Sequence, residues 1–202
     1  MKNNLIIAGV PRAGKSTLSN MLSHTFGYQH VSMDAFIAGM EAAFPDLGFK
    51  WWPGEAAESA KSERIDIYRN ASEKTALLLK AMLESGEYDE FEPGMVVDVY
   101  QLLPEHYTKY LSGKNCGIIY LLTSDVTPEE RFIIHREYDT EKHYSFTFSD
   151  DDMRSHCTFV VEQSRFLKEQ CIQYGLPYLE TAKNRETTFT QFIQSFPDTH
   201  HQ

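Results

Sequence analysis

Apolar residues in this 202-residue chain gather in two kinds of segment that alternate along the sequence. Short segments, most of them apolar runs bounded by Gly or by polar residues, predict strands. Longer segments with apolar residues three or four positions apart predict helices. This alternation indicates an α/β fold, a parallel sheet with helices on both faces. The predicted strands are 5–8, 28–33, 94–98, 117–122 and 177–181, and the predicted helices are about 15–24, 37–44, 55–84, 128–136, 153–174 and 186–196.

The longest stretch between predicted strands covers about 37–92 and reads as an insertion. Its main helix has the regular apolar steps of one buried face. Those positions are Ile65, Tyr68, Ala71, Thr75, Leu78 and Met82, with a possible break near Lys61. No internal repeat or low-complexity linker divides the chain, so we expect one domain over 1–202 that carries this helical insertion.

A second irregular region, about 127–152, follows the fourth predicted strand. Thr127 and Glu130 have the spacing of a capping box, with Pro128 at the first helical position. The polar and aromatic segment after this helix, 137–149, predicts a mobile cover. The acidic run 150–152 is interpreted as solvated charge at the start of the next helix rather than as a metal site.

Between the first strand and the first helix lies Gly-x-x-x-x-Gly-Lys-Ser, from Gly9 to Ser16. This is the phosphate-binding loop pattern in the structural context that it requires. The glycines let the loop curl so that its amide groups point at an anion at the start of a helix. The Lys15 ammonium is expected to reach the β- and γ-phosphates, and the Ser16 hydroxyl to bind Mg²⁺. The candidate nucleotide-binding residues here are Gly9, Arg12, Ala13, Gly14, Lys15, Ser16 and Thr17.

Two aspartates stand at the carboxyl ends of predicted strands, the edge of the sheet where ligands bind in open α/β folds. Asp34 is a candidate general base for a substrate hydroxyl, or a carboxylate that assists at the magnesium. The alternative for Asp34 is an N-cap of a helix that begins near Ala35. Asp98 ends the third predicted strand and resembles the aspartate that organises magnesium in phosphate-loop proteins. Its alternative is an ordinary strand-ending aspartate.

Composition narrows the possible partners. The formal net charge of −10 argues against a general affinity for nucleic acid or for anionic membranes. The odd number of cysteines and their lack of metal-ligand spacing indicate reduced thiols, so we expect a cytoplasmic protein without zinc. No apolar run is as long as a membrane span.

The order of these parts resembles the P-loop nucleotide and small-molecule kinases of the adenylate-kinase-like group. Besides the loop, His30–Phe36 is similar to the strand-end aspartate segment of nucleoside, shikimate, gluconate and chloramphenicol kinases. Val96–Tyr100 resembles the third-strand segment of adenylate kinases, although Val99 stands where Gly is usual. The resemblance implies a three-layer α/β/α P-loop fold, with a five-stranded parallel sheet in the order 2-3-1-4-5, a helical insertion and a lid.

Further site residues are implied by the same resemblance. The stretch 121–136 is similar to the strand and lid helix that bring arginines to the phosphates, which makes Arg131 and Arg136 catalytic candidates. The sequence leaves open which of Arg131, Arg136 and Arg12 reaches the transferred phosphoryl group. The stretch 181–186, with Asn184 and Arg185, resembles the loop that brackets adenine, although an ordinary polar turn fits it as well.

The insertion matches no substrate signature, so its candidates rest on residue type. Trp51 and Trp52 either pack the insertion onto the body or line a pocket for a planar or sugar-like substrate. Arg64 and Arg69 either hold an anionic group or belong to a polar helix face. Tyr100, beyond the third strand, is a further substrate-binding candidate.

The sequence thus predicts an ATP- and Mg²⁺-dependent kinase acting on a hydroxyl of a small molecule, as a monomer or homodimer. Lys15, Asp34, Arg131 and Arg136 are the catalytic candidates, and Ser16, Asp98 and Asp34 the metal ligands. The alternatives are a nucleotide monophosphate kinase and a P-loop ATPase or nucleotide sensor that acts on a protein partner. A GTPase-type switch is disfavoured because the sequence contains neither Asn-Lys-x-Asp nor Asp-x-x-Gly.

Overall fold

The computed structural model describes residues 4–50, 61–87, 90 and 92–199, and its centre is a five-stranded sheet. All neighbouring strands are parallel, in the order β2-β3-β1-β4-β5, which confirms the predicted sheet and strand order. The strands are β1 (Asn4–Gly9), β2 (Gln29–Ser32), β3 (Met95–Val99), β4 (Cys116–Leu122) and β5 (Tyr178–Glu180).

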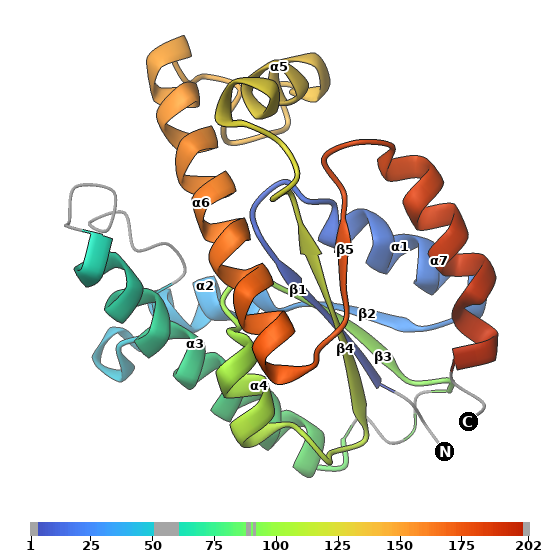
Figure 1. The fold of residues 1–202 in the computed structure, drawn as a ribbon. Coiled ribbons are helices and arrows are strands. Elements are labelled where there is room, and N and C mark those ends of the chain that lie inside the picture. The colour runs from blue at the N-terminus through green and yellow to red at the C-terminus, as the bar shows by residue number, and fades with distance from the viewer. Residues whose placement is uncertain (1–3, 51–60, 88–89, 91, 200–202) are drawn as a thin grey trace.

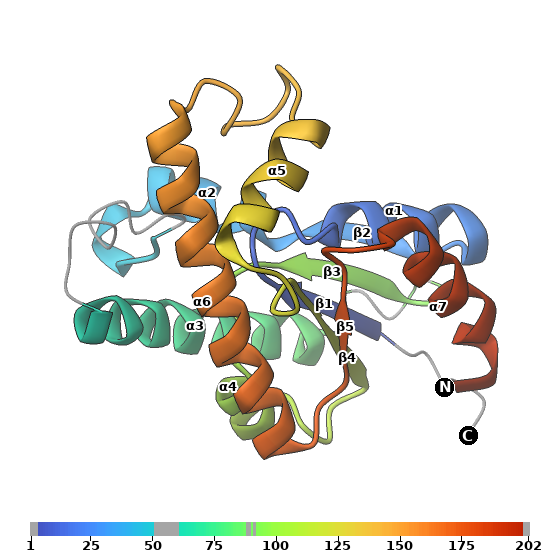
Figure 2. The ribbon, with the colours of Figure 1, turned by 45° about the horizontal axis from the view of Figure 1, so that its top comes forward.

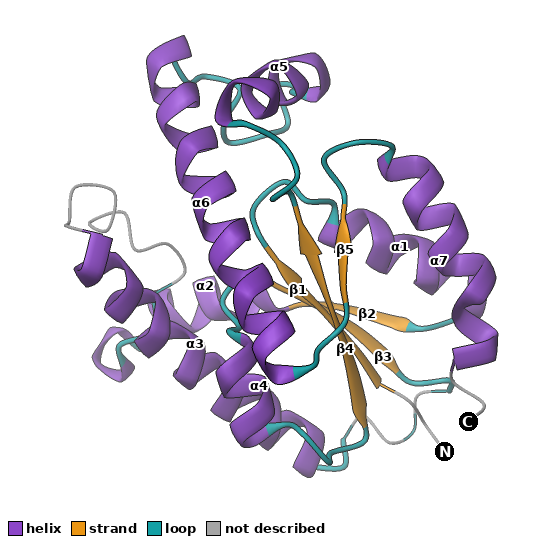
Figure 3. Ribbon diagram, in the orientation of Figure 1, coloured by secondary structure: helices purple, strands orange, loops and turns teal. Residues whose placement is uncertain are grey.

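Helices cover both faces of this sheet (Figures 1 and 3). On one face α1 packs on β3 and α7 on β5, whereas α6 packs on β4 on the other face beside α4 and α3 (Figure 2). The helices are α1 (Lys15–Phe26), α2 (Met33–Ala43), α3 (Lys61–Glu84), α4 (Pro104–Tyr110), α5 (Pro128–Tyr138), α6 (Asp150–Tyr174) and α7 (Arg185–Thr199), with a 3-10 turn η1 (Pro45–Leu47). No helix among the described residues is long and apolar enough to cross a membrane.

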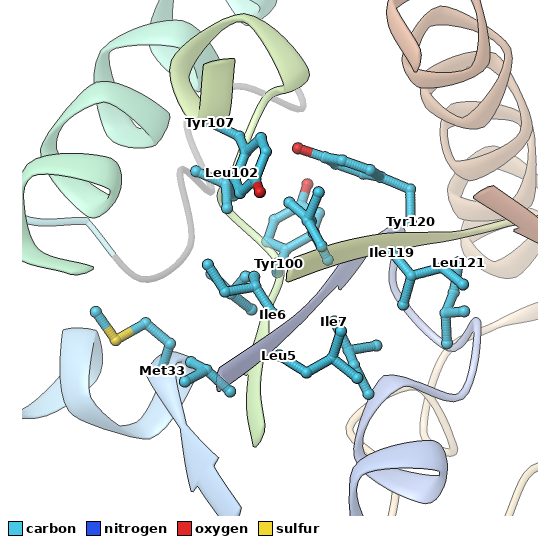
Figure 4. Packing of buried hydrophobic residues seen from close by; sticks show 14 of the residues in the cluster. Leu5, Ile6, Ile7, Met33, Tyr100, Leu102, Tyr107, Ile119, Tyr120 and Leu121 are labelled. Atoms are coloured by element: carbon cyan, nitrogen blue, oxygen red, sulfur yellow. The ribbon is translucent and has the colours of Figure 1, made fainter. Parts of the chain in front are cut away.

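The core surrounds the middle strand. Every residue of β1 is buried, as expected for a strand that has a neighbour on each side and helices on both faces. Ile6 and Ile7 point to opposite faces and pack among side chains of β4 and of the segment after β3 (Figure 4). The buried core thereby fixes the end of β1, from which the phosphate loop starts.

Two helix boundaries differ from the predicted ones. The second helix begins at Met33 rather than near residue 37, with Ser32 as its N-cap residue, so the N-cap interpretation of Asp34 is wrong. Helix α6 begins at Asp150 rather than at 153. The Ser149 side chain caps it by accepting from the Asp152 amide, and its acidic first turn interacts favourably with the helix dipole. The capping box at Thr127 and Glu130 is confirmed.

Helix α4 was not predicted from the sequence. It is only seven residues long, and Leu103 at its N-cap provides no side-chain hydrogen bond. Its stability comes from tertiary packing instead, since Pro104, His106 and Tyr107 are buried. The Ser72 hydroxyl on α3 shares a hydrogen bond with the His106 ring and accepts from the Leu103 amide.

Gly9 ends β1 at a point where no side chain fits. Its φ is +132°, and a Cβ there would lie 2.1 Å from the carbonyl oxygen of Leu121 on β4. We expect Gly9→Ala to lower the free energy of unfolding by roughly 2–5 kcal/mol, because backbone strain and a steric overlap add together.

Gly39 gives the matched control for this prediction. It lies inside α2 with open space around its Cα, so Gly39→Ala is expected to raise stability by about 0.5–1 kcal/mol. Urea unfolding of both variants measures the difference. Equal midpoints for the two variants would contradict the assigned packing at Gly9.

Candidate active site

The loop between β1 and α1 has the backbone of a phosphate cradle. Gly14 (φ +97°) and Arg12 (φ +60°) adopt left-handed conformations that curl the chain before α1 begins at Lys15. Lys15 is 8% exposed, and its ammonium donates to the Val10 carbonyl oxygen at 3.0 Å. The N-terminus of α1, which is the positive end of its dipole, and this ammonium therefore lie together at the loop.

Two arginines support the loop from outside. The Arg131 guanidinium donates to the carbonyl oxygens of Arg12 (3.2 Å) and Pro11 (3.5 Å), and Arg185 donates to the same Arg12 oxygen at 2.8 Å. Burial, together with the charge of Arg185, lowers the pKa of Arg131 to about 10. Arg131 is 2% exposed, so in this structure its guanidinium holds the loop backbone and does not line the cavity.

A cavity of about 540 Å³ opens beside the loop. This volume is within the range of small-molecule and cofactor sites. Asp34, from the start of α2, and Tyr100, after β3, line it opposite the loop. Its lining residues are Pro11, Arg12, Gly14, Lys15, Ser16, Thr17, Asp34, Tyr100, His143, Tyr144, Phe148 and Arg185.

The Asp34 carboxylate lies at the centre of this arrangement. Its Oδ1 accepts from the Tyr100 amide at 3.0 Å, which fixes the carboxylate beside the end of β3. Burial raises the pKa of Asp34, while the Lys15 charge opposes that change. Burial in turn lowers the pKa of Lys15, against the attraction of Asp34 and Asp98. A carboxylate with a raised pKa beside an ammonium with a lowered pKa, both in one cavity, is typical of catalytic sites.

The Ser16 hydroxyl donates to Oδ2 of Asp98, which joins α1 to β3 at the base of the cradle. The other oxygen, Oδ1, is buried and has no hydrogen-bond partner among the described residues. The His30 ring on β2 approaches Oδ2 at 3.4 Å. A hydroxyl and a carboxylate oxygen are the kind of ligands that Mg²⁺ prefers, so these residues fit a magnesium ion held mainly by phosphates and water.

The segment after α5 covers the cavity and contributes three of its lining residues, His143, Tyr144 and Phe148. Arg12 reaches this segment: its guanidinium donates to Asp139 at 3.4 Å and contacts the His143 ring at 2.9 Å. The sequence predicted a cover here but identified none of its cavity residues. The aromatic residues spaced through this otherwise polar segment are the signal that would have found two of them.

Behind the cover, His135 and His156 pack edge to face with ring centroids 5.9 Å apart. Burial, reinforced by the charges of Arg131 and Arg12, lowers the pKa of His135 to about 3 and that of His156 to about 4. The His156 ring also shares a hydrogen bond with the Tyr144 hydroxyl at 3.1 Å. Both rings are therefore neutral at pH 7.

This pair predicts acid sensitivity. The folded pKa of His156 lies below its ordinary 6.5, so its stabilisation is fully present above pH 6.5 and is lost as the pH falls toward 4. We expect the melting temperature to fall between pH 7 and 4.5, with a loss on the order of 1–2 kcal/mol per histidine at pH 5. His156→Phe should flatten this fall, whereas His24→Gln on an exposed helix surface should not. An unchanged slope in His156→Phe would contradict the prediction.

Several predicted site residues do not line the cavity beside the phosphate loop. Arg136 donates to Phe148 O and Asp150, both at 2.8 Å, and so ties α5 to the start of α6. Arg69 is paired with Glu105 at 2.7 Å and lines neither described cavity. Arg64 lines a second cavity, and Asn184 is exposed at the loop before α7.

The predictions for Trp51 and Trp52 fall outside the described residues.

No protein-family model and no curated protein sequence matches this chain. Solved structures match it along nearly its whole length. The shikimate kinase from Acinetobacter baumannii, in complex with shikimate, has a TM-score of 0.54 at 13% identity, covering 98% of this chain and 93% of that one. The shikimate kinase from Bacteroides thetaiotaomicron has a TM-score of 0.52 at 15% sequence identity, and the match covers 99% of both chains. A sugar kinase from Janibacter sp. has a TM-score of 0.52 at 14% sequence identity, and the match covers 98% of this chain and 95% of that one. The likeness concerns the fold: this chain has the P-loop kinase fold.

Proposed function

We propose that this protein is an ATP- and Mg²⁺-dependent kinase that transfers a γ-phosphoryl group to a hydroxyl of a small molecule. The observation that carries the proposal is the convergence of Lys15, Ser16 and Asp34 on one cavity, at the base of which Asp98 binds Ser16. The solved kinases of this fold support the reaction class, and the shikimate complex is an example of a hydroxyl-bearing ligand in one of them.

In the proposed reaction the acceptor oxygen forms a bond to the γ-phosphorus, and the bond from that phosphorus to the oxygen bridging to ADP breaks. Asp34 orients the hydroxyl and takes its proton. Lys15 and the loop amides stabilise the charge on the β- and γ-oxygens. Ser16 and Asp98 would hold a magnesium ion, which would neutralise further charge on the phosphates.

Of the three arginines that the sequence offered for the transferred phosphoryl group, we assign the contact to Arg12 rather than to Arg131 or Arg136, and we add Arg185. The two assigned arginines line the cavity, whereas Arg131 is buried under the loop and Arg136 is paired with Asp150. Arg12 already projects from the phosphate loop toward the cover, so its guanidinium needs only a side-chain rotation to face a phosphate. Tyr144 and Phe148 exclude water, which would otherwise hydrolyse the nucleotide.

The test is an ATP-consumption screen with Mg²⁺ across nucleosides, nucleotides, sugars, sugar acids and aminoglycoside-like alcohols. Consumption that requires one acceptor, with transfer of the γ-phosphoryl to it, would support the proposal. A nucleoside monophosphate as that acceptor would indicate a nucleotide kinase instead. Slow consumption that no acceptor changes would overturn the proposal in favour of an ATPase that acts on a protein partner.

A further inference from the structure

A second cavity, of about 450 Å³, adjoins the first between α3 and α6. Tyr100 lines both cavities, so a ligand in the second lies one side chain away from the first. The lining residues are Arg64, Ile65, Tyr68, Tyr100, Phe159, Glu162, Gln163, Arg165, Phe166 and Glu169.

The wall between the two cavities is fixed by hydrogen bonds. The Tyr68 hydroxyl donates to the Tyr100 carbonyl oxygen at 2.8 Å, and the Tyr100 hydroxyl interacts with the Gln163 amide at 3.1–3.3 Å. The Tyr100 amide donates to Asp34 on the other side. The same residue therefore orients the proposed base and shapes the second cavity.

The lining of this cavity is aromatic and balanced in charge. Tyr68, Tyr100, Phe159 and Phe166 supply four aromatic side chains, with Ile65 among them. Two arginines, Arg64 and Arg165, are matched by two glutamates, so the part of the lining formed by described residues carries no net formal charge. Burying a carboxylate or phosphate here would remove its hydration, and each of the two described arginines is already balanced by a glutamate of the same lining. A planar ring, in contrast, gains apolar burial and offset or edge contacts with the aromatic rings.

We propose that this cavity holds the body of the phosphate acceptor, and that the acceptor is an uncharged planar-ring compound with a hydroxyl, such as a nucleoside or a heteroaromatic alcohol. The ring lies among Tyr68, Phe159 and Phe166, and the hydroxyl extends past Tyr100 to Asp34. This inference rests on the proposed kinase reaction and adds the chemical class of its substrate. Sugar acids and phosphorylated polyols are disfavoured by the same lining.

The experiment compares two pairs of probes on the full-length protein. Thymidine and pyridoxine are the uncharged ring alcohols, and gluconate and glycerate are the carboxylate polyols. Calorimetry measures the binding of each probe with and without a non-hydrolysable ATP analogue, and radiolabelled γ-phosphate measures transfer. We expect binding and transfer with a ring alcohol and none with the carboxylates.

Two variants localise the binding. Phe166→Ala removes one aromatic wall, and Ile65→Trp places a larger side chain in the cavity at a half-buried position outside the core. Each is expected to raise the dissociation constant of the ring alcohol at least tenfold while leaving ATP-analogue binding unchanged. The matched control is Ile172→Ala, which changes a 65% exposed position on the same helix as Phe166.

The outcomes separate the two proposals. Transfer to a carboxylate polyol that neither cavity variant alters would overturn the acceptor class but support the kinase. Ring-alcohol binding that is lost in both variants, without any transfer, would support the cavity assignment and overturn the kinase. Binding and transfer of a ring alcohol that both variants leave unchanged would overturn the cavity assignment alone.

Discussion

Replacing Lys15 with Met is expected to lower phosphoryl transfer by roughly 10²–10³-fold, the cost of removing one positioned charge from a transition state. Met keeps the length of the buried stem, so the variant loses the ammonium rather than the packing. The ammonium lies inside the loop, where it donates to Val10, and no other lysine lines the cavity among the described residues. Steady-state transfer with the acceptor found in the screen measures the loss.

Lys80→Met is the matched control, because Lys80 lies on α3 away from the cavity, with a 38% exposed side chain whose ammonium is 4.0 Å from Glu84. It should retain the activity of the unmodified protein. A Lys15→Met variant that keeps near-normal transfer while folded would contradict the proposed chemistry of the loop.

Asp34→Asn is expected to lower transfer by roughly 10²–10⁴-fold, the usual contribution of a general base. The amide oxygen can still accept from Tyr100, so the local structure and nucleotide binding should persist. The result would therefore be a loss of turnover without a loss of ATP-analogue affinity. Asp66→Asn on the exposed face of α3 controls for the change of charge, since its side chain is 76% exposed.

The pH dependence gives a second measure of Asp34. A base must be ionised, so activity should be lost as the pH falls through its pKa, and burial places that pKa above the ordinary value of an aspartate. The acid limb of the rate profile should therefore lie above the usual carboxylate range and should be missing from the residual activity of Asp34→Asn. The same limb in both proteins would assign it to another group.

The fold could be predicted because its signals are local. The run before Gly9, the loop pattern and the following helix each specify one element, and parallel strands joined through helices admit few arrangements. The capping box at Thr127 is equally local, since its two hydrogen bonds join residues three positions apart. Helix α4 lacks such a signal, because it is held by contacts to α3 that are distant in sequence.

The candidate site could be predicted only in part. Lys15, Ser16 and Asp34 follow from the loop pattern and from the edge of the sheet, and the structure brings them to one cavity. The roles of the arginines depend on which carbonyl oxygens and carboxylates lie nearby after folding, as with Arg131 under the loop and Arg136 beside Asp150. Sequence spacing carries no information on such long-range partners.

The contact between Arg12 and Asp139 has a thermodynamic consequence. The Asp139 side chain is 3% exposed and also accepts from the Ser145 hydroxyl, so it anchors the cover as well as Arg12. A phosphate that draws Arg12 from Asp139 therefore changes the free energy of the cover, and by linkage the cover changes the affinity for that phosphate by the same factor. Binding of a nucleotide should therefore change the hydrogen-exchange rates of backbone amides in 139–149. The change should extend to amides that the nucleotide does not contact.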